Sequence, residues 1–158
     1  MREKIGNPAI PHFANRLPCA ALSHHLAKGI FGSFAYHQSG RYDGDGWSVN
    51  VVDDSPGNFM NYGPYSTSVS AEAHTAVFRL QVDNVDADNY NILYIDVYDA
   101  TTDTVVASKS IYRNEFRVPS KYQNFKLAFT PSAPYHSFEF RTYWFGGSYV
   151  KQDKVAVF

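Results

Sequence analysis

The sequence predicts an all-β fold, in which two packed antiparallel sheets form a β-sandwich of the jelly-roll type with about eight strands. The first observation behind this prediction is that short segments of alternating apolar and polar residues recur along the chain, separated by turn-forming residues. The second is that no helical pattern lies between these segments. A chain of 158 residues is also long enough to form one domain with a sizeable core.

The clearest alternation lies in residues 74–82 and 92–98, which are joined by a connection rich in Asp and Asn. In the first segment, one face consists of His74, Ala76, Phe78, Leu80 and Val82. In the second segment, Leu93, Ile95 and Val97 lie on one face, and Tyr94, Asp96 and Tyr98 lie on the other. Because successive strand side chains point to opposite faces, both segments are predicted as half-buried strands of an antiparallel sheet.

The chain begins with a segment that does not alternate. Residues 1–30 are predicted as an arm or linker, in which residues 17–28 suit a short helix, since Pro18 fits a first turn and Gly29 fits a helix end. The sandwich itself is predicted to span residues 31–158.

The remaining strands follow from the same alternation. Residues 30–38 and 47–52 are predicted as strands, and residues 59–73, which are rich in aromatic side chains, are predicted as a long loop. Four more strands are predicted at 105–112, 124–130, 137–144 and 149–158. In the second of these, Phe125, Leu127 and Phe129 are predicted to point inward. In the third, Phe138, Phe140 and Trp144 share one face, and Glu139, Arg141 and Tyr143 share the other.

Composition excludes several classes of partner. The formal net charge of −1 and the pI near 6.6 favour neither nucleic acid nor an anionic membrane surface. The single cysteine, Cys19, excludes an internal disulfide. No apolar run is long enough for a membrane span, and polar residues and prolines interrupt the N-terminus where a signal peptide would be apolar. We therefore expect either an intracellular protein or a piece of a longer secreted or cell-surface protein.

Aromatic residues are unusually frequent, at 16% of the chain, with 12 Tyr, 12 Phe and 2 Trp. The polar tips of Tyr and Trp need water or a partner, which makes these residues common at recognition surfaces. The alternative is that the strands themselves account for them, because β-structure favours aromatic side chains.

Several motifs resemble, in their order along the chain, the galactose-binding-domain-like jelly rolls of bacterial carbohydrate-binding modules. The motifs are DGDGW, NYGPY, HTAVFRLQVDN, IDVYDA, FEFRTYW and QDKVAVF, and they cover roughly residues 31–158. Ala73 and His74 stand where the family usually has Gly and Tyr. The resemblance implies a noncatalytic, lectin-like module that binds a glycan or polysaccharide, either at the loop end of the sandwich or on a concave sheet face.

Sugar recognition needs flat rings against the C–H faces of the sugar and polar groups for its hydroxyls. Three predicted loops or strand ends supply this mixture, so the loop end is the preferred site. The predicted ligand-binding residues are Arg41, Asp45, Trp47, Asn61, Tyr62, Tyr65, Trp144 and Tyr149. In the alternative interpretation, Trp47, Trp144 and Phe59 simply close the ends of the sandwich.

The resemblance also implies a structural Ca²⁺, which takes six to eight oxygen ligands. The predicted ligands are Asp43, Asp53 and Asp153. Asp153 alternates with Val155 and Val157 and is therefore predicted to point toward the core, where a carboxylate needs a cation or hydrogen bonds. The alternative partners for Asp153 are backbone amides or Lys151.

No catalytic motif is present: the sequence has no G-x-S-x-G elbow and no phosphate-binding glycine loop. Glu139 is predicted on an exposed face, beside Arg141 and within reach of Arg79 if their strands are neighbours, which indicates a surface ion pair rather than a catalytic carboxylate pair. The main rival to sugar binding is a protein-interaction domain of a multidomain surface protein. A polysaccharide-degrading enzyme is the third alternative.

Overall fold

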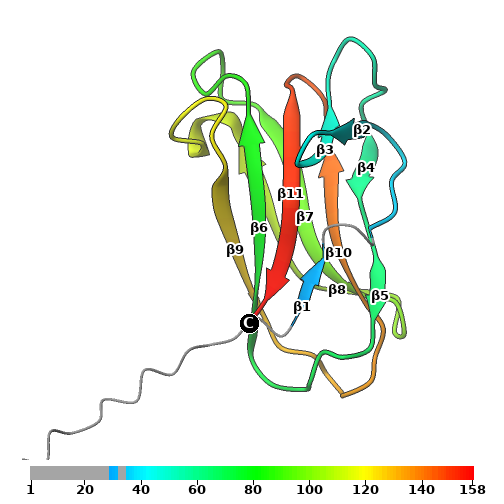
Figure 1. Ribbon diagram of the computed structural model, residues 1–158. Helices are drawn as coiled ribbons and strands as arrows, with labels where there is room; N and C mark the ends of the chain where they lie inside the picture. Colours follow the sequence, from blue (N-terminus) through cyan, green and yellow to red (C-terminus); the bar gives the residue numbers. More distant parts are fainter. Residues whose placement is uncertain (1–28, 32–34) are drawn as a thin grey trace, which may run out of the picture.

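The computed structural model describes residues 29–31 and 35–158, which form two antiparallel sheets packed face to face (Figure 1). This confirms the predicted all-β sandwich. Residues 1–28 of the predicted arm, with the short helix predicted at 17–28 and Cys19, lie outside the described residues, whereas Gly29 and Ile30 belong to a strand of the sandwich. In the part of the chain that is described, no helix is long and apolar enough to cross a membrane.

The six-stranded sheet has the order β2-β3-β11-β6-β9, and β1 also pairs with β11. Its strands are β1 (Gly29–Phe31), β2 (Arg41–Asp43), β3 (Gly46–Val49), β6 (His74–Val82), β9 (Gln123–Phe129) and β11 (Val150–Val157). The five-stranded sheet has the order β4-β10-β7-β8, and β5 also pairs with β10. Its strands are β4 (Asn58–Asn61), β5 (Pro64–Ser66), β7 (Asn91–Asp99), β8 (Thr104–Tyr112) and β10 (Phe138–Trp144).

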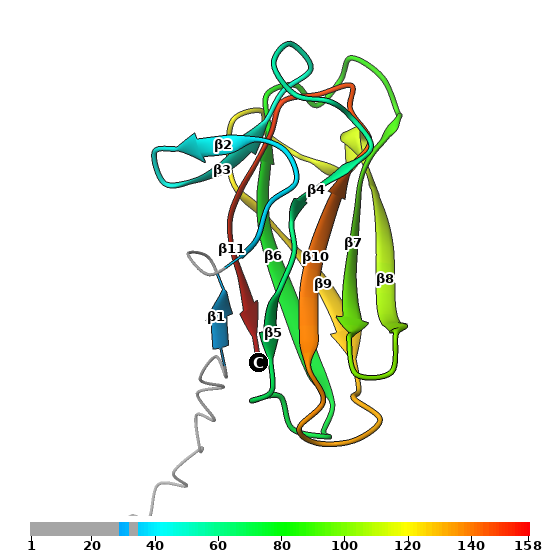
Figure 2. The same ribbon diagram turned by 90° about the vertical axis from the view of Figure 1, so that its right-hand side faces the viewer.

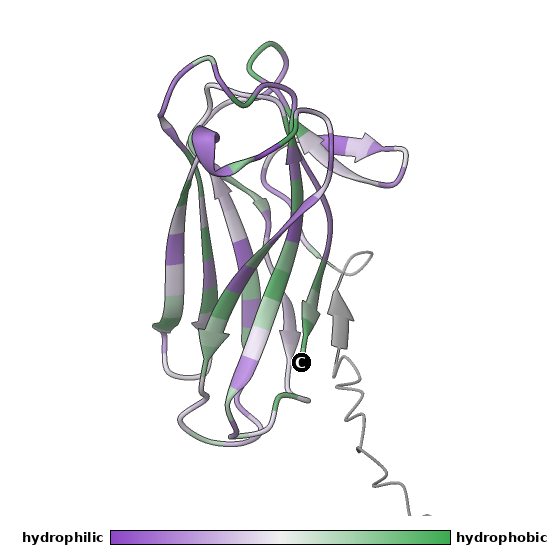
Figure 3. Cartoon of the chain, turned by 90° about the vertical axis from the view of Figure 1, so that its left-hand side faces the viewer, coloured by the Kyte–Doolittle hydropathy of each residue, from purple (hydrophilic) through white to green (hydrophobic). Residues whose placement is uncertain are grey.

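The core lies between the inner faces of the long strands, and the bands of apolar and polar residues along these strands are visible in Figure 3. The side chains that alternation predicts to point inward are buried: Ala76, Phe78, Leu80, Val82, Leu93, Ile95, Val97, Phe125, Leu127, Phe129, Phe138, Phe140 and Trp144. Burying each of the larger ones contributes about 1.5–3 kcal/mol, so this two-residue period drives the packing of the sheets.

The two clearest strands do not share a sheet. β6 pairs with β9 and β11, whereas β7 pairs with β8 and β10. The polar connection between them crosses from one layer to the other, so their apolar faces lie on opposite sides of the same core. Alternation predicts that a strand has a buried face, but it does not predict which strand lies beside it.

Two local predictions are wrong. Where the structure describes the strand predicted at 30–38, it shows β1 at the start and, in residues 35–38, a single bridge between Tyr36 and Tyr62 in place of a strand. The aromatic loop predicted at 59–73 contains β4 and β5, which both pair with β10 and form the edge of the five-stranded sheet (Figure 2). Pro64 in β5 has no N–H to donate, and an edge position tolerates that loss.

A bulge in β11 changes the position of Asp153. The pairing with β6 shifts between Gln152 and Lys154, which makes Asp153 the extra residue and interrupts the alternation. Asp153 is therefore only half-buried, and its carboxylate pairs with Arg79 of β6. The prediction that Asp153 points toward the core is wrong for this reason.

Candidate functional site

A continuous row of six aromatic rings follows the β4–β5 edge on the outer face of the five-stranded sheet. The neighbouring ring centroids are 5.1 Å apart for Phe145 and Tyr143, 5.1 Å for Tyr143 and Phe59, 6.3 Å for Phe59 and Tyr62, 5.5 Å for Tyr62 and Tyr36, and 6.0 Å for Tyr36 and Tyr65. We call these six residues the aromatic row. Its position follows from β10, which turns Phe140 and Trp144 into the core and Tyr143 outward.

Three rings of the aromatic row are open to solvent, Phe145 at one end and Tyr36 and Tyr65 at the other. Tyr36, Tyr65 and Phe145 are 53%, 45% and 45% exposed. The Tyr143 hydroxyl donates to the carbonyl of Gly57 at 2.8 Å, which holds that ring in place. Gly63 has φ +91°, and a Cβ there would lie 3.0 Å from the Tyr36 ring, so this glycine lets the ring lie against the backbone.

Arg141 of β10 lies beside the row and is held rigidly. Its Nε and Nη2 donate to the two carboxylate oxygens of Asp96 at 2.8 and 2.7 Å. Its guanidinium lies 3.8 Å from the Tyr98 ring centroid and 5.0 Å from that of Phe59. Burial alone would lower the pKa of Arg141, but the hydrogen bond and charge of Asp96 raise it, so the group remains a cation.

Glu139 lies on the same face and is not the exposed residue predicted from the sequence. It is only 5% exposed, and β10 places it opposite Tyr98 on one side and Pro64 on the other. The predicted ion pair with Arg79 is wrong, because Arg79 belongs to the other sheet. Burial, followed by the charge of Glu139, raises the pKa of Tyr65, which places the Tyr65 ring beside this carboxylate.

The face therefore offers a line of apolar rings with polar groups fixed beside it. The rings can stack on flat, C–H-rich surfaces of a ligand. Carboxylate oxygens accept hydrogen bonds from hydroxyls, and the guanidinium donates them. The arrangement suits an elongated ligand that is apolar on its faces and hydroxylated on its edges.

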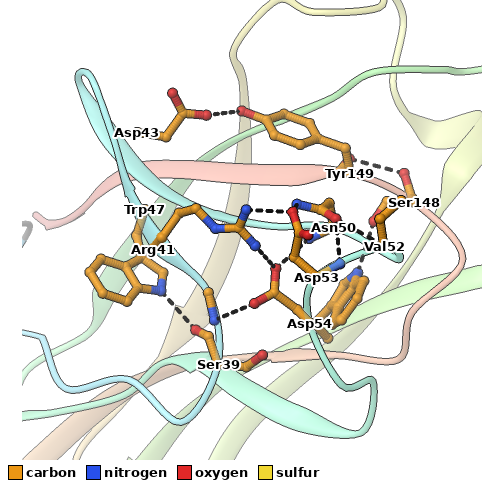
Figure 4. Close-up of polar contacts among 12 residues, drawn as sticks. Ser39, Arg41, Asp43, Trp47, Asn50, Val52, Asp53, Asp54, Ser148 and Tyr149 are labelled. Atoms are coloured by element: carbon orange, nitrogen blue, oxygen red, sulfur yellow. Dashed lines mark hydrogen bonds and ion pairs between the residues drawn. The ribbon is translucent and has the colours of Figure 1, made fainter.

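The loop end, which the sequence favours as the site, holds a network of ion pairs instead (Figure 4). Arg41 contacts Asp53 at 2.6 Å and Asp54 at 2.8 Å. Asp54 also accepts from the amides of Gly40 and Asn50, at 3.1 and 2.9 Å. The predicted ligand contact of Arg41 is thus already made within the protein.

Neither tryptophan presents a fully open ring. Trp47 stacks on His37 with centroids 3.5 Å apart and an interplanar angle of 7°, which covers one face of its ring. Its Nε1 donates to the Ser39 carbonyl at 2.8 Å. Trp144 is completely buried and donates to the Ser148 carbonyl at 3.2 Å, so it packs in the core and cannot stack on a ligand.

The other predicted contacts divide between the two regions. Tyr62 and Tyr65 join the aromatic row, whereas Asn61 is buried and lies against His37. Tyr149 donates its hydroxyl to Asp43 at 2.7 Å (Figure 4). Burial and this bond raise the pKa of Tyr149 to about 12.

The structure does not bring the three predicted calcium ligands together. Asp53 pairs with Arg41 and Asp153 with Arg79. The Lys151 ammonium lies 2.5 Å from Asp45 and 3.9 Å from Asp43, at the place between two carboxylates where a cation is favoured. Within residues 29–31 and 35–158, no group of three or more His, Cys, Asp or Glu side chains is arranged to hold a metal ion.

Sequence reasoning missed Tyr36, Tyr143 and Phe145 as candidate contacts, together with the charged residues Asp96, Glu139 and Arg141. The signal for the β7 and β10 residues is present in the alternation, because the faces opposite the core carry Tyr94, Asp96 and Tyr98 in β7 and Glu139, Arg141 and Tyr143 in β10. An outward face this rich in rings and charges indicates recognition rather than simple solvation.

No known protein-family profile matches the sequence, and no curated protein sequence matches it either. Among solved structures, the chain is similar to a carbohydrate-binding module from Cellvibrio mixtus lichenase 5A in complex with cellotriose, with 12% identity over 84% of this chain and 97% of that one, at a TM-score of 0.47. The C-terminal family 6 carbohydrate-binding module of a marine laminarinase from Zobellia galactanivorans is 11% identical over 82% of this chain and 97% of that one, at a TM-score of 0.48. A two-module structure of Clostridium thermocellum xylanase 10B, complexed with xylohexaose, is 13% identical over 85% of this chain and 27% of that one, at a TM-score of 0.44.

Proposed function

We propose that this protein is a noncatalytic carbohydrate-binding module and that its ligand, an oligosaccharide or polysaccharide, lies along the aromatic row. The observation that carries this proposal is the row itself: six contiguous rings on an outer sheet face, with Arg141 and Glu139 fixed beside them. A sugar presents C–H faces to the rings and hydroxyls to the charged groups. Six rings suit several sugar units rather than one.

The sheet face is a better site than the loop end because its contact groups are available. At the loop end, Arg41 and Asp45 already hold ionic partners, and one face of Trp47 is covered. A ligand there would have to break these contacts and would gain only what exceeds that cost. The aromatic row instead exposes rings that the strands have already positioned, so little ordering is needed on binding.

A binding role fits the carboxylates of this face better than catalysis does. Glycoside hydrolysis needs one carboxyl as proton donor and a second as base or nucleophile across the scissile bond. Asp96 is 1% exposed, and Arg141 occupies both of its oxygens. We expect no release of reducing ends from any polysaccharide that the protein binds.

Because such ligands lie outside cells, the proposal implies a module of a secreted or cell-surface protein.

The test is truncation of one exposed ring near each end of the row. A glycan array identifies the ligand, and titration calorimetry then measures its affinity for Tyr36→Ala, Phe145→Ala and the double variant. Each single change is expected to weaken binding by about 10-fold or more, because buried aromatic anchors contribute about 1–2 kcal/mol or more to recognition. Thermal unfolding should change little, since both rings are about half exposed.

Two exposed tyrosines away from the row serve as matched controls. Tyr135→Ala removes a ring that is 83% exposed, and Tyr42→Ala removes one that is 72% exposed in β2 at the loop end. Both variants should bind as the wild type does. If Tyr42→Ala or Arg41→Gln loses binding while the row variants still bind, the ligand binds at the loop end and not along the row. A folded protein that binds no glycan would favour the protein-interaction alternative.

A further inference from the structure

We infer that the aromatic row selects neutral glycans and discriminates against glycans that carry carboxylate or sulfate groups. This inference rests on the proposed function and adds the substrate class. Its basis is the negative charge beside the row.

The outer face of the five-stranded sheet carries more negative than positive groups. Among the described residues it holds three carboxylates, Asp96, Asp103 and Glu139, and one cation, Arg141. Asp96 is neutralised by Arg141, and Asp103 accepts the hydroxyl of Tyr98. Glu139 has no ion-pair partner among the described residues, and its hydrogen bond with Tyr65 is to a neutral group. With three carboxylates and one cation, the charge beside the rings is therefore negative overall.

The positive charge of Arg141 is not available to an incoming anion. Two of its nitrogens are bonded to Asp96, its flat faces lie against Tyr98 and Phe59, and the side chain is 16% exposed. No described residue accepts from its third nitrogen, Nη1, which can still donate to a neutral hydroxyl. An arginine held in this way acts as a hydrogen-bond donor and not as a free counter-ion.

The burial of Glu139 strengthens its effect. At 5% exposure, water screens its charge poorly, so an anionic substituent on the ligand would be repelled more strongly than at an open surface. A sugar hydroxyl can instead donate to it. Recognition of the neutral ligand and rejection of the charged one therefore come from the same group.

The other described cations lie elsewhere. Arg41 and Arg113 belong to loop networks, Lys109 pairs with Glu115, and the remaining ones lie in or beside the six-stranded sheet: Arg79, Arg117, Lys121, Lys126, Lys151 and Lys154. Arg117 and Lys121 have no carboxylate partner among the described residues and line a pocket of about 240 Å³ with Tyr122 and Gln123. Anionic polymers attracted by these two residues would bind away from the row, so both charges are removed in the experiment below.

The test compares neutral polymers with their charged derivatives. Soluble β-glucan, xylan, mannan and galactan are each paired with a carboxymethylated form, and affinities are measured in 20 mM and 500 mM NaCl. The protein carries Arg117→Gln and Lys121→Gln in all measurements. For each polymer that binds, the carboxymethylated form is expected to bind at least 10-fold more weakly at low salt, with a smaller difference at high salt, because salt screens repulsion.

Glu139→Gln is expected to reduce the affinity difference between neutral and carboxymethylated polymers several-fold at low salt, because it removes the charge and keeps a hydrogen-bonding side chain. Asp103→Asn, an exposed position on the same face, provides a second variant if the buried glutamine prevents folding. Asp153→Asn makes the same charge change on the other sheet and should leave the difference unaltered. Equal affinities for neutral and charged polymers would overturn the inference while leaving the proposed function intact. Binding to none of the polymers would overturn both.

Discussion

Asp99 shows what a single buried carboxylate does in this molecule. It is 1% exposed, and it accepts from His136 at 2.6 Å and from the amides of Thr101 and Thr102 at 2.9 and 3.3 Å. It thereby joins the β7–β8 turn to the segment before β10. Burial opposes ionisation of this group, but the bonds from His136 and the amides outweigh it and lower the pKa of Asp99.

A lowered pKa makes part of the stability dependent on pH. The contribution is complete above the ordinary aspartate pKa of about 3.9 and is lost as the pH falls through the lower value of the folded state. Asp99→Ala is therefore expected to reduce the free energy of unfolding by about 1–3 kcal/mol at pH 7, because it removes the buried acceptor of these three hydrogen bonds.

Urea unfolding at a series of pH values from 7 to 2.5 measures this effect. The variant should differ most from the wild type at pH 7 and least at the acid end. Asp86→Ala, at an exposed position, is the control and should follow the wild type throughout. Parallel stability curves for Asp99→Ala and the wild type would contradict the assignment.

At the scale of elements, Arg113 joins three connections at one end of the sandwich. Its side chain is 3% exposed, its Nε donates to Asp88 at 2.8 Å, and its Nη2 donates to the carbonyl of Gly147. Its Nη1 lies 3.3 Å from both the Asn84 carbonyl and the Ser148 hydroxyl. The β6–β7 and β10–β11 connections, which both cross between the sheets, are thus tied to the short 3₁₀ turn after β8.

Arg113→Met should be one of the most destabilising changes in the described part of the chain. It removes the partners of Asp88 and of the Gly147 and Asn84 carbonyls, and disruption of a buried ionic network costs about 3–5 kcal/mol. Arg117→Met makes the same substitution at an exposed position and should cost less than about 0.5 kcal/mol. Chemical denaturation of both variants measures the difference, and similar midpoints would show that Arg113 does not hold these connections together.

At the scale of the whole molecule, structural calcium remains a prediction from the family resemblance. Two carboxylates at the loop end, those of Asp43 and Asp45, share the Lys151 ammonium. Calcium would have to displace that lysine to use them. Lys151→Met is therefore expected to make them more available to calcium, because the mutation leaves two carboxylates without their cation.

Thermal unfolding in 1 mM CaCl₂ and in EGTA tests both the predicted structural calcium and the predicted effect of Lys151→Met. The melting temperature of Lys151→Met should rise in calcium by roughly 1–3 °C more than that of the wild type, since a ligand that binds only the folded state stabilises it. Lys126→Met, which removes a charge from the outer face of β9, is the control. A wild type that loses stability in EGTA would support a structural calcium, whereas equal responses of the variant and the wild type would exclude this pair of carboxylates.

Much of the architecture was predictable because alternation is local. Residues 74–82, 124–130 and 137–144 show which side chains enter the core, and the structure confirms these faces. The wrong predictions concern features that depend on pairing between strands far apart in the chain. β6 and β7 were not predicted in different sheets, and β4 and β5 were not predicted as strands, because their partner β10 lies more than seventy residues further along the chain.

Residue types and their two-residue period are enough to predict the all-β class and the buried faces of the long strands, and composition gives the excess of tyrosine and phenylalanine. Which aromatic side chains come together depends instead on how distant strands pair. The aromatic row draws its rings from residues 36, 59–65 and 143–145, which meet because β4 and β5 pair with β10. The same packing buries Trp144 and pairs Arg41 with two aspartates. Exposure and ionic pairing depend on neighbours that are distant in the chain, and the local pattern does not specify them.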